Sequence, residues 1–423
     1  MAARGVIVAV AGPVETRVVE AVGARPSLSI ARRCADLAEA VAAAAAGVGA
    51  VAIVSDQPHL TRSAVAQIEG HGVVVVGLAR SEDEADHLRA IGVRATVAAA
   101  SDQAALGAAL EEALESAMDA VSSPAQAALP GPVDEPRREG TLIAVWGPTG
   151  APGRTTIAAN LAAELAALGH GTLLVDADTY GGAVAQACGM ADEAPGLAAA
   201  ARTAQHGVLD ASRLARHALA LAPRLSVLTG ITRPERWTEL PAAALDEVWS
   251  AARALADVTV VDCGFGLDRD EDLAYDTAAP QRNGATLGVL TAATDVIAVG
   301  TAEPLGIQRL VHGLDRLRDV TALEPVVVVN RVRAEVVGPR PEEAVADALL
   351  RFARVPRVWP VPWDPRACDA AVLAGTLLVE QAPRSRARRA IAALAASVAP
   401  MPSTSDPVDS PRRPRSVAAA VGH

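Results

Sequence analysis

The feature that most constrains the fold is a hydrophobic run that enters a glycine- and proline-rich turn and continues as a helix. The run Thr141–Trp146 has the composition of a buried strand, and residues 147–153 read Gly-Pro-Thr-Gly-Ala-Pro-Gly. Apolar residues then recur at helical spacing over Ile157–Leu168. Backbone N–H groups in such a turn point at one place, and the helix N-terminus adds positive partial charge there. We therefore expect a strand–loop–helix unit that binds phosphate.

The turn departs from the usual phosphate-binding pattern, in which the last glycine precedes lysine and then serine or threonine. Here Gly153 is followed by Arg154 and Thr155, and the 423-residue chain contains no lysine. Arginine keeps the positive charge, but it is longer and planar. Phosphoryl transfer depends mostly on the positioning of charge. We therefore expect phosphate binding to be more secure than hydrolysis.

Composition limits the classes of function. A chain of 423 residues with 51% hydrophobic content suggests two or three domains with sizeable cores. The net charge of −11 argues against sequence-specific binding of nucleic acid, because neutralising phosphates needs a positive face. Four widely spaced cysteines suggest neither a disulfide framework nor a metal site.

The N-terminal residues and the apolar segments predict where the protein acts. No signal peptide opens the chain, so we expect a cytoplasmic protein. The most apolar window, Ala40–Val54, is too short to span a bilayer. Contact with a membrane is then at most peripheral, at its inner face.

Patterning predicts an α/β protein with two parallel-sheet domains. Residues 1–120 alternate helical segments with short apolar runs, as in a small parallel sheet buried on both faces. Residues 121–139 form a Pro/Ser-rich linker, 140–399 form a larger α/β domain, and 400–423 are predicted to be a disordered tail. The expected strands of the small domain are Val6–Ala11, Ala50–Val54, Val73–Gly77 and Ala95–Ala98.

The small domain resembles a response-regulator receiver, which has a flavodoxin-like fold, in its length and order of elements. Asp56 closes an apolar run, where a phospho-accepting aspartate would sit. A receiver also needs an acidic pair after its first strand, where this chain has Gly12 and Pro13, and a lysine, which it lacks. An inert receiver-like docking domain is therefore favoured over phosphorelay.

Polar residues end several apolar runs of the larger domain. In open parallel sheets the carboxyl ends of strands meet at one edge, where ligands bind. A single aspartate at a strand end is more often a turn or helix cap than a ligand. The ordered set instead favours a nucleotide site, and its members are Asp176 and Asp178 in the run 173–179, Asp262 in 258–266, Asn330 in 325–330, and Pro362 and Asp364 in 358–364.

Together these motifs resemble the MinD/ParA family of P-loop ATPases with a deviant Walker A motif. The receiver-like front end makes the CpaE/TadZ branch the most similar, a branch associated with Flp/Tad pilus placement and septum-site determination. The resemblance implies a nucleotide-switched positioning factor that binds ATP and Mg²⁺ and hydrolyses ATP weakly. It also implies a nucleotide-dependent homodimer whose partners are pilus-assembly or division proteins.

The resemblance assigns roles to individual residues. Asp178 would orient the attacking water, with Asp176 and Arg154 as further catalytic residues. Thr155 would bind Mg²⁺, and Asp262 would support it through water. Asn330 would contact adenine beside Pro362, and the run Arg282–Leu290 would follow the second switch. The phosphate-binding positions would be Gly150, Ala151, Pro152, Gly153, Arg154, Thr155 and Thr156.

Two departures from the family pattern leave the activity open. Thr149 stands where the family has a signature lysine that reaches across the dimer, and Arg154 replaces the loop lysine. The alternative to a weak ATPase is a non-hydrolysing scaffold that docks pilus or division machinery. The segment Arg384–Val398, with Ile391, Leu394 and Val398 on one stripe, is favoured as the last packed helix over a membrane-binding helix.

Overall fold

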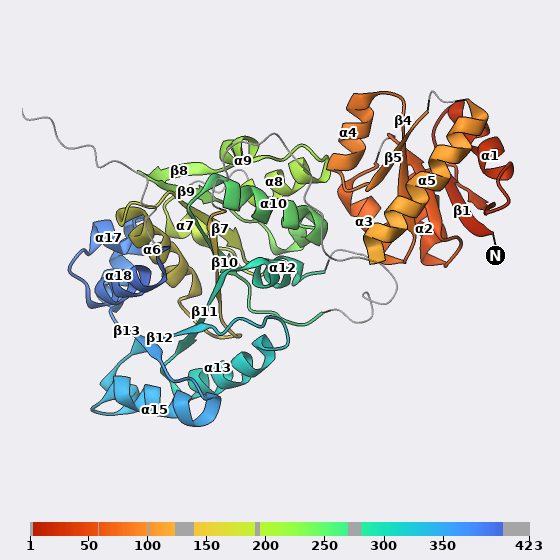
Figure 1. Cartoon of the computed structure of the whole chain (residues 1–423). Coiled ribbons are helices and arrows are strands. Elements are labelled where there is room, and N and C mark those ends of the chain that lie inside the picture. The colour runs from red at the N-terminus through yellow and green to blue at the C-terminus, as the bar shows by residue number, and fades with distance from the viewer. Residues whose placement is uncertain are drawn as a thin grey trace, which may run out of the picture.

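Two helix-covered sheets make up the part of the chain that the computed structural model describes (Figure 1). We refer to residues 3–122 as the N-terminal unit and to residues 139–400 as the C-terminal unit. Residues 123–138 of the predicted linker (121–139) and 401–423 of the predicted tail (400–423) lie outside the described residues. The described residues are 3–57, 59–99, 102–122, 139–190, 195–269 and 281–400.

The N-terminal unit contains a five-stranded parallel sheet in the order β2-β1-β3-β4-β5, which is the flavodoxin-like order. The predicted parallel α/β fold is confirmed, and four of the strands lie where the sequence predicted them. The sequence did not predict β2, because Leu28 is its only buried residue and an exposed edge strand needs no apolar run. The strands are β1 (Arg4–Ala9), β2 (Leu28–Arg33), β3 (Val51–Ser55), β4 (Val74–Ala79) and β5 (Ala95–Ala98).

Helices cover both faces of this first sheet. Side chains of Asp36, Thr61 and Ser81 accept backbone N–H groups at the starts of α2, α3 and α4, which fixes where these helices begin. The cores place α1 and α5 on one face and α2, α3 and α4 on the other. The helices are α1 (Val14–Gly23), α2 (Leu37–Ala45), α3 (Arg62–Gly70), α4 (Glu82–Ala90) and α5 (Gln103–Ser122).

The C-terminal unit contains an eight-stranded sheet in the order β13-β12-β11-β6-β10-β7-β9-β8. All its pairings are parallel except β8 with β9, so this sheet is mixed rather than wholly parallel as expected. The chain winds in opposite directions on the two sides of β6, and in open α/β sheets ligands bind beyond the carboxyl ends of the strands at such a switch point. The strands are β6 (Thr141–Trp146), β7 (Thr172–Ala177), β8 (Leu219–Ala222), β9 (Leu225–Leu228), β10 (Val258–Cys263), β11 (Asp295–Thr301), β12 (Val326–Val332) and β13 (Val358–Pro362).

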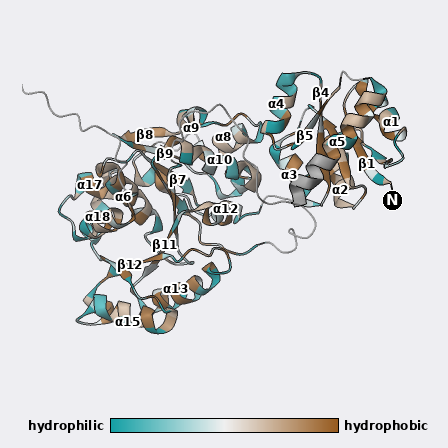
Figure 2. Ribbon diagram, viewed as in Figure 1, coloured by the Kyte–Doolittle hydropathy of each residue, from teal (hydrophilic) through white to brown (hydrophobic). Residues whose placement is uncertain are grey.

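Two hydrophobic cores sandwich the second sheet. One holds residues of α6, α17 and α18, and the other holds residues of α8, α10, α12, α13 and α15. Figure 2 shows hydrophobic residues gathered on the strands and hydrophilic ones on outer helices such as α4. The helices are α6 (Arg154–Ala167), α7 (Val184–Ala187), α8 (Gly196–Gln205), α9 (Ala211–His217), the 3₁₀ helix η1 (Pro234–Glu239), α10 (Ala242–Leu255), α12 (Gly284–Ala292), α13 (Pro304–Leu317), α14 (Ala334–Val337), α15 (Pro341–Ala353), α16 (Pro365–Ala374), α17 (Leu378–Gln381) and α18 (Arg386–Val398).

The C-terminal helix α18 packs inside the unit. Ile391 and Leu394 are buried in the core shared with α6, and Val398 is partly buried against it. The apolar stripe of this helix therefore faces protein. None of the described helices combines the length and apolar content needed to cross a bilayer.

The two units touch through α3, which packs on α8 and α10. Nη1 of Arg62 lies 3.0 Å from Oε1 of Glu247, and this ion pair joins α3 to α10. Gly207 has φ +66°, and a Cβ on it would lie 2.8 Å from the carbonyl carbon of Ala90. Glycine at position 207 thus allows the two units to approach closely.

We predict that Gly207→Ala lowers the melting temperature more than Gly169→Ala does. Both glycines have positive φ, so alanine is strained at each by about 1–2 kcal/mol. Gly169 has no atom within 4 Å of a built Cβ, whereas Gly207 meets Ala90. Equal shifts in thermal unfolding would show that the contact between the units contributes nothing.

Candidate functional site

The glycine-rich loop between β6 and α6 is the centre of the site. Gly150 and Gly153 have φ angles of +67° and +104°, which side chains other than glycine rarely adopt. Within the loop, the amide of Ala151 donates to the carbonyl of Pro148 (3.1 Å). A Cβ on Gly147 would clash with the carbonyl oxygen of Val299 on β11. The loop thus lies close to the neighbouring strand and needs its glycines.

The side chain of Arg154 forms hydrogen bonds with the start of this loop and with the segment after β7. Its Nη1 donates to the carbonyl of Gly147 (2.9 Å), and its Nη2 donates to Oδ2 of Asp178 (3.2 Å). Both side chains of the ion pair are largely buried, with 16% and 8% of their surfaces exposed. The guanidinium also lies 6.0 Å from the ring centroid of Phe265. The arginine that replaces the loop lysine is therefore hydrogen-bonded to the carboxylate of Asp178 and the carbonyl of Gly147.

Thr155 and Asp262 form the contact between α6 and β10. The Thr155 hydroxyl donates to Oδ2 of Asp262 (2.6 Å), and Asp262 is 1% exposed. Its other oxygen, Oδ1, is buried and has no hydrogen-bond partner among the described residues. Burial raises the pKa of Asp262 well above its usual value, and the nearby Asp176 carboxylate raises it further. The hydrogen bond from Thr155 and the charge of Arg154 act in the opposite direction.

This pair fits a magnesium ion. Mg²⁺ prefers oxygen ligands and binds through one or two carboxylates together with water and phosphate oxygens. A nearby cation would offset the charge that burial disfavours, and a water that it orders could reach the unpartnered oxygen of Asp262.

Asp176 and Asp178 have different environments. Both oxygens of Asp176 accept backbone amides, Oδ1 from Asp178 (3.1 Å) and Oδ2 from Val184 (3.1 Å). Oδ1 of Asp178 accepts the amides of Tyr180 (2.9 Å) and Gly181 (3.3 Å), while Oδ2 faces Arg154. Asp176 therefore organises the segment after β7, and Asp178 reaches the loop.

Side chains connect the end of β7 to the start of α12. The Tyr180 hydroxyl donates to Oδ1 of Asn283 (2.9 Å), and the Thr179 hydroxyl donates to the carbonyl of Arg282 (2.9 Å). The Arg282 guanidinium lies 4.4 Å from the Tyr180 ring centroid. The helix expected within Arg282–Leu290 is present as α12, and residues 270–280 before it lie outside the described residues.

On the opposite side, Asn330 joins β12 to the loop. Its Nδ2 donates to the carbonyl of Pro152 (3.2 Å), and its Oδ1 accepts the amide of Arg331 (2.9 Å). Pro362 ends β13 and pairs with Val332 of β12. This corner is where the sequence predicted an adenine contact.

Trp363 is a residue of this corner that sequence reasoning missed. Its side chain is partly exposed, and the guanidinium groups of Arg331 and Arg333 lie 4.8 and 5.4 Å from its ring centroid. A tryptophan directly after the Pro-Val-Pro end of a strand was the available signal. The neighbouring Asp364 caps α16 and accepts the hydroxyl of Ser385 (2.9 Å).

The structure thus brings the predicted residues to one edge of the sheet, although not all of them meet. Asp178, Asp262 and Asn330 contact the loop or the first turn of α6, whereas Asp176 bonds to backbone outside the loop. Thr156 follows in α6, where its carbonyl accepts the Asn160 side chain (2.8 Å).

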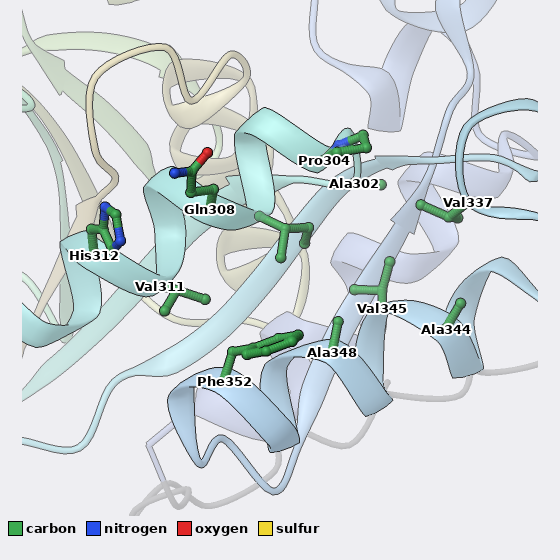
Figure 3. Close-up of a pocket in the computed structure, with 11 residues that line it drawn as sticks. Ala302, Pro304, Gln308, Val311, His312, Val337, Ala344, Val345, Ala348 and Phe352 are labelled. Carbon is green, nitrogen blue, oxygen red and sulfur yellow. The ribbon is translucent and has the colours of Figure 1, made fainter.

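An apolar pocket elsewhere on the unit is separate from this site. It measures about 460 Å³ and lies between α13 and α15, where Val311 faces Ala348 and Phe352 (Figure 3). None of residues 147–156 lines it. The loop and not this pocket is therefore the candidate nucleotide site.

Comparison with known families identifies the C-terminal unit. The model of the CobQ/CobB/MinD/ParA nucleotide binding domain matches residues 143–372, more than half of the chain. The chain belongs to this family. The resemblance to MinD/ParA proteins seen in the sequence is confirmed, and the matched residues include the loop, Asp262 and Asn330.

The chain is also similar to individual proteins. An uncharacterised ATP-binding protein of Methanocaldococcus jannaschii is 25% identical over 265 residues, which cover 60% of this chain and 86% of the relative. A ParA family ATPase from Chlorobium tepidum has the same fold, with 18% identity, a TM-score of 0.51, and coverage of 62% of this chain and 99% of that one. The septum site-determining protein MinD of Pyrococcus horikoshii, solved with Mg-ADP, is 22% identical with a TM-score of 0.48 and coverage of 61% and 96%.

We predict that Asp262→Asn abolishes Mg²⁺-dependent nucleotide binding yet raises the melting temperature of the ligand-free protein. The substitution removes a buried charge and keeps an oxygen that can accept the Thr155 hydroxyl. In a domain of this size about 1 kcal/mol corresponds to about 2–4 °C. Because the folded-state pKa of Asp262 is raised, its stabilising contribution is present below the unfolded pKa and is lost as pH rises toward the folded pKa. The gain from Asn should therefore grow with pH.

The matched control is Asp257→Asn, at the opposite end of the same strand region. Oδ2 of Asp257 accepts the amide of Gly171 (2.7 Å), away from the loop. This variant should leave nucleotide binding unchanged. A pH-independent difference between wild type and Asp262→Asn would contradict the prediction.

Proposed function

We propose that the protein is an ATP-binding, weakly hydrolysing positioning factor whose partner binding is switched by nucleotide. The observation that carries this proposal is the Thr155–Asp262 pair beside the glycine-rich loop. In this pair, one buried carboxylate oxygen has no hydrogen-bond partner among the residues that the structure describes. Such a pair is suited to Mg²⁺ bound together with phosphate. Membership of the CobQ/CobB/MinD/ParA family supports the same ligand class.

This proposal assigns a separate role to each group of residues at the carboxyl edge of the second sheet. Loop amides and the N-terminus of α6 bind the phosphates, and Thr155 and Asp262 hold the metal. Bound Mg²⁺ would neutralise charge on the phosphate oxygens. Asp178 would orient water once Arg154 has turned toward phosphate. Asn330, with Pro362 and Trp363 beside it, would contact the base.

We further propose a CpaE/TadZ-like role in placing Flp/Tad pili or determining the septum site. The flavodoxin-like strand order of the N-terminal unit supports this branch. Asp56 follows β3 in that unit and lies 3.8 Å from Nε2 of His87. The unit would serve as a docking domain of residues 1–120, followed by the linker 121–139, the ATPase domain 140–399 and the tail 400–423. ATP would favour a cytoplasmic homodimer that recruits pilus-assembly or division proteins, with at most peripheral membrane contact.

A second candidate function is a scaffold that binds nucleotide without hydrolysing it. The ion pair between Arg154 and Asp178 favours this alternative, because it engages two groups that turnover would need. Breaking a buried pair is costly when either partner is left alone. Nucleotide must therefore supply a better partner for Arg154 before Asp178 is free.

Steady-state phosphate release distinguishes the two functions. We predict slow release by wild type that is at least about tenfold lower in Asp178→Ala, as expected for loss of a group that positions the nucleophile. Titration calorimetry with MgATP and MgADP, run beside light scattering, should show binding and an ATP-dependent dimer. Equal background release by both proteins, with nucleotide binding intact, would establish the scaffold instead.

We also predict that Arg154→Lys raises phosphate release by about tenfold. A lysine offers a compact charge suited to phosphate and cannot hold the Gly147 carbonyl and Asp178 with a planar fork. Asp178 would then be free to position water. The measurement is phosphate release at saturating MgATP.

The control for this prediction is Arg388→Lys, which alters another largely buried arginine–carboxylate pair. Arg388 donates to both oxygens of Glu164 (2.6 and 2.8 Å), and this pair joins α18 to α6 away from the loop. It should lower the melting temperature without changing turnover. An increase in both variants, or in neither, would refute a specific role for Arg154.

A further inference from the structure

Arg309, on α13, lies against the glycine-rich loop. A Cβ placed on Gly150 would clash with Nη1 of Arg309 and would lie 3.2 Å from its Cζ. The guanidinium therefore occupies the space that a side chain at position 150 would take. Glycine at this position lets a cation from another element reach the loop backbone.

Close packing fixes the helix that carries Arg309. A Cβ on Gly313 would lie 3.0 Å from both Pro148 of the loop and Trp146 of β6, and one on Gly306 would clash with Thr301. Leu310 is fully buried beneath the helix. Since α13 rests on the loop and on the strand before it, its position beside Gly150 is set by the core.

The charge on Arg309 has no carboxylate partner among the described residues. On the same helix, Arg316 pairs with Asp268. Arg154, the cation within the loop sequence, is held by Asp178. Thr149, which precedes Gly150, carries no charge. Among the described residues, the arginine without a carboxylate partner at the Gly150 end of the loop is therefore Arg309.

The position of Arg309 also indicates which part of a bound nucleotide it would contact. Asn330, on the proposed base side, contacts the Pro152–Gly153 end of the loop. Arg309 contacts the Gly150 end. A nucleotide with its base near Asn330 would thus extend its phosphates away from that corner and toward Arg309.

We propose that Arg309 binds the terminal phosphate of ATP and makes the site prefer a triphosphate over a diphosphate. This inference rests on the proposed function. A guanidinium can donate two parallel hydrogen bonds to phosphate oxygens, which adds geometric selectivity to its charge. Arg309 is exposed and forms no ion pair with a described residue, so it can turn to a ligand.

The test is calorimetric titration of MgATP and MgADP into wild type, Arg309→Ala, Arg309→Lys and the control Arg316→Ala, at about 0.15 M salt to limit long-range effects. Arg309→Ala should weaken ATP binding about tenfold and change ADP binding less than about twofold, as expected for one charge-assisted contact. Arg309→Lys should keep part of the preference. Arg316→Ala should bind both nucleotides as wild type does.

The other outcomes overturn the inference in distinguishable ways. Unchanged ATP affinity in Arg309→Ala, with wild type binding nucleotide, would refute the role of Arg309 alone. An equal loss of ATP and ADP affinity would show that Arg309 supports the loop and does not select the terminal phosphate. A wild type that binds neither nucleotide would overturn the proposed function together with this inference. Melting temperatures within a few degrees of wild type would confirm that the exposed substitutions leave the fold intact.

Discussion

Three buried carboxylates share one edge of the second sheet, and the rest of the site depends on how their charges are balanced. Backbone amides satisfy Asp176, and Asp178 combines two amides with the Arg154 guanidinium. Asp262 accepts one hydroxyl, from Thr155, and its other oxygen has no hydrogen-bond partner among the described residues. Burying an unbalanced carboxylate costs free energy. The described side chains do not fully balance these charges, and a bound cation would do so.

Arginine in place of the loop lysine changes this balance. A lysine would be a point charge on a flexible stem, whereas the planar guanidinium of Arg154 binds the Gly147 carbonyl and Asp178 at once. In the proposed function, the contact between Arg154 and Asp178 would keep Asp178 from positioning the attacking water. In that proposal, phosphate binding and turnover would place opposing demands on Arg154.

The sequence predicted those strands and site residues whose positions follow from a local sequence pattern. Buried parallel strands were readable as apolar runs, and Asp262 and Asn330 met the loop because parallel strands end at one edge. The exposed edge strand β2 lacks that pattern. Arg309 and Trp363 were missed because their contacts depend on how α13 and the segment after β13 pack in three dimensions. The different environments of Asp176 and Asp178 likewise depend on amides of the following turn, which strand periodicity does not describe.

A chain of contacts connects the glycine-rich loop to the contact between the two units. Asp178 accepts the amide of Tyr180, whose hydroxyl bonds Asn283 at the start of α12. Helix α12 packs on α10, and α10 carries Glu247, the partner of Arg62 in the N-terminal unit. Coupling between distant sites needs elements that are physically continuous and have two arrangements. The contacts form a continuous path here, and we expect a change at the Arg154–Asp178 pair to reach Tyr180 first, because Asp178 also accepts the Tyr180 amide.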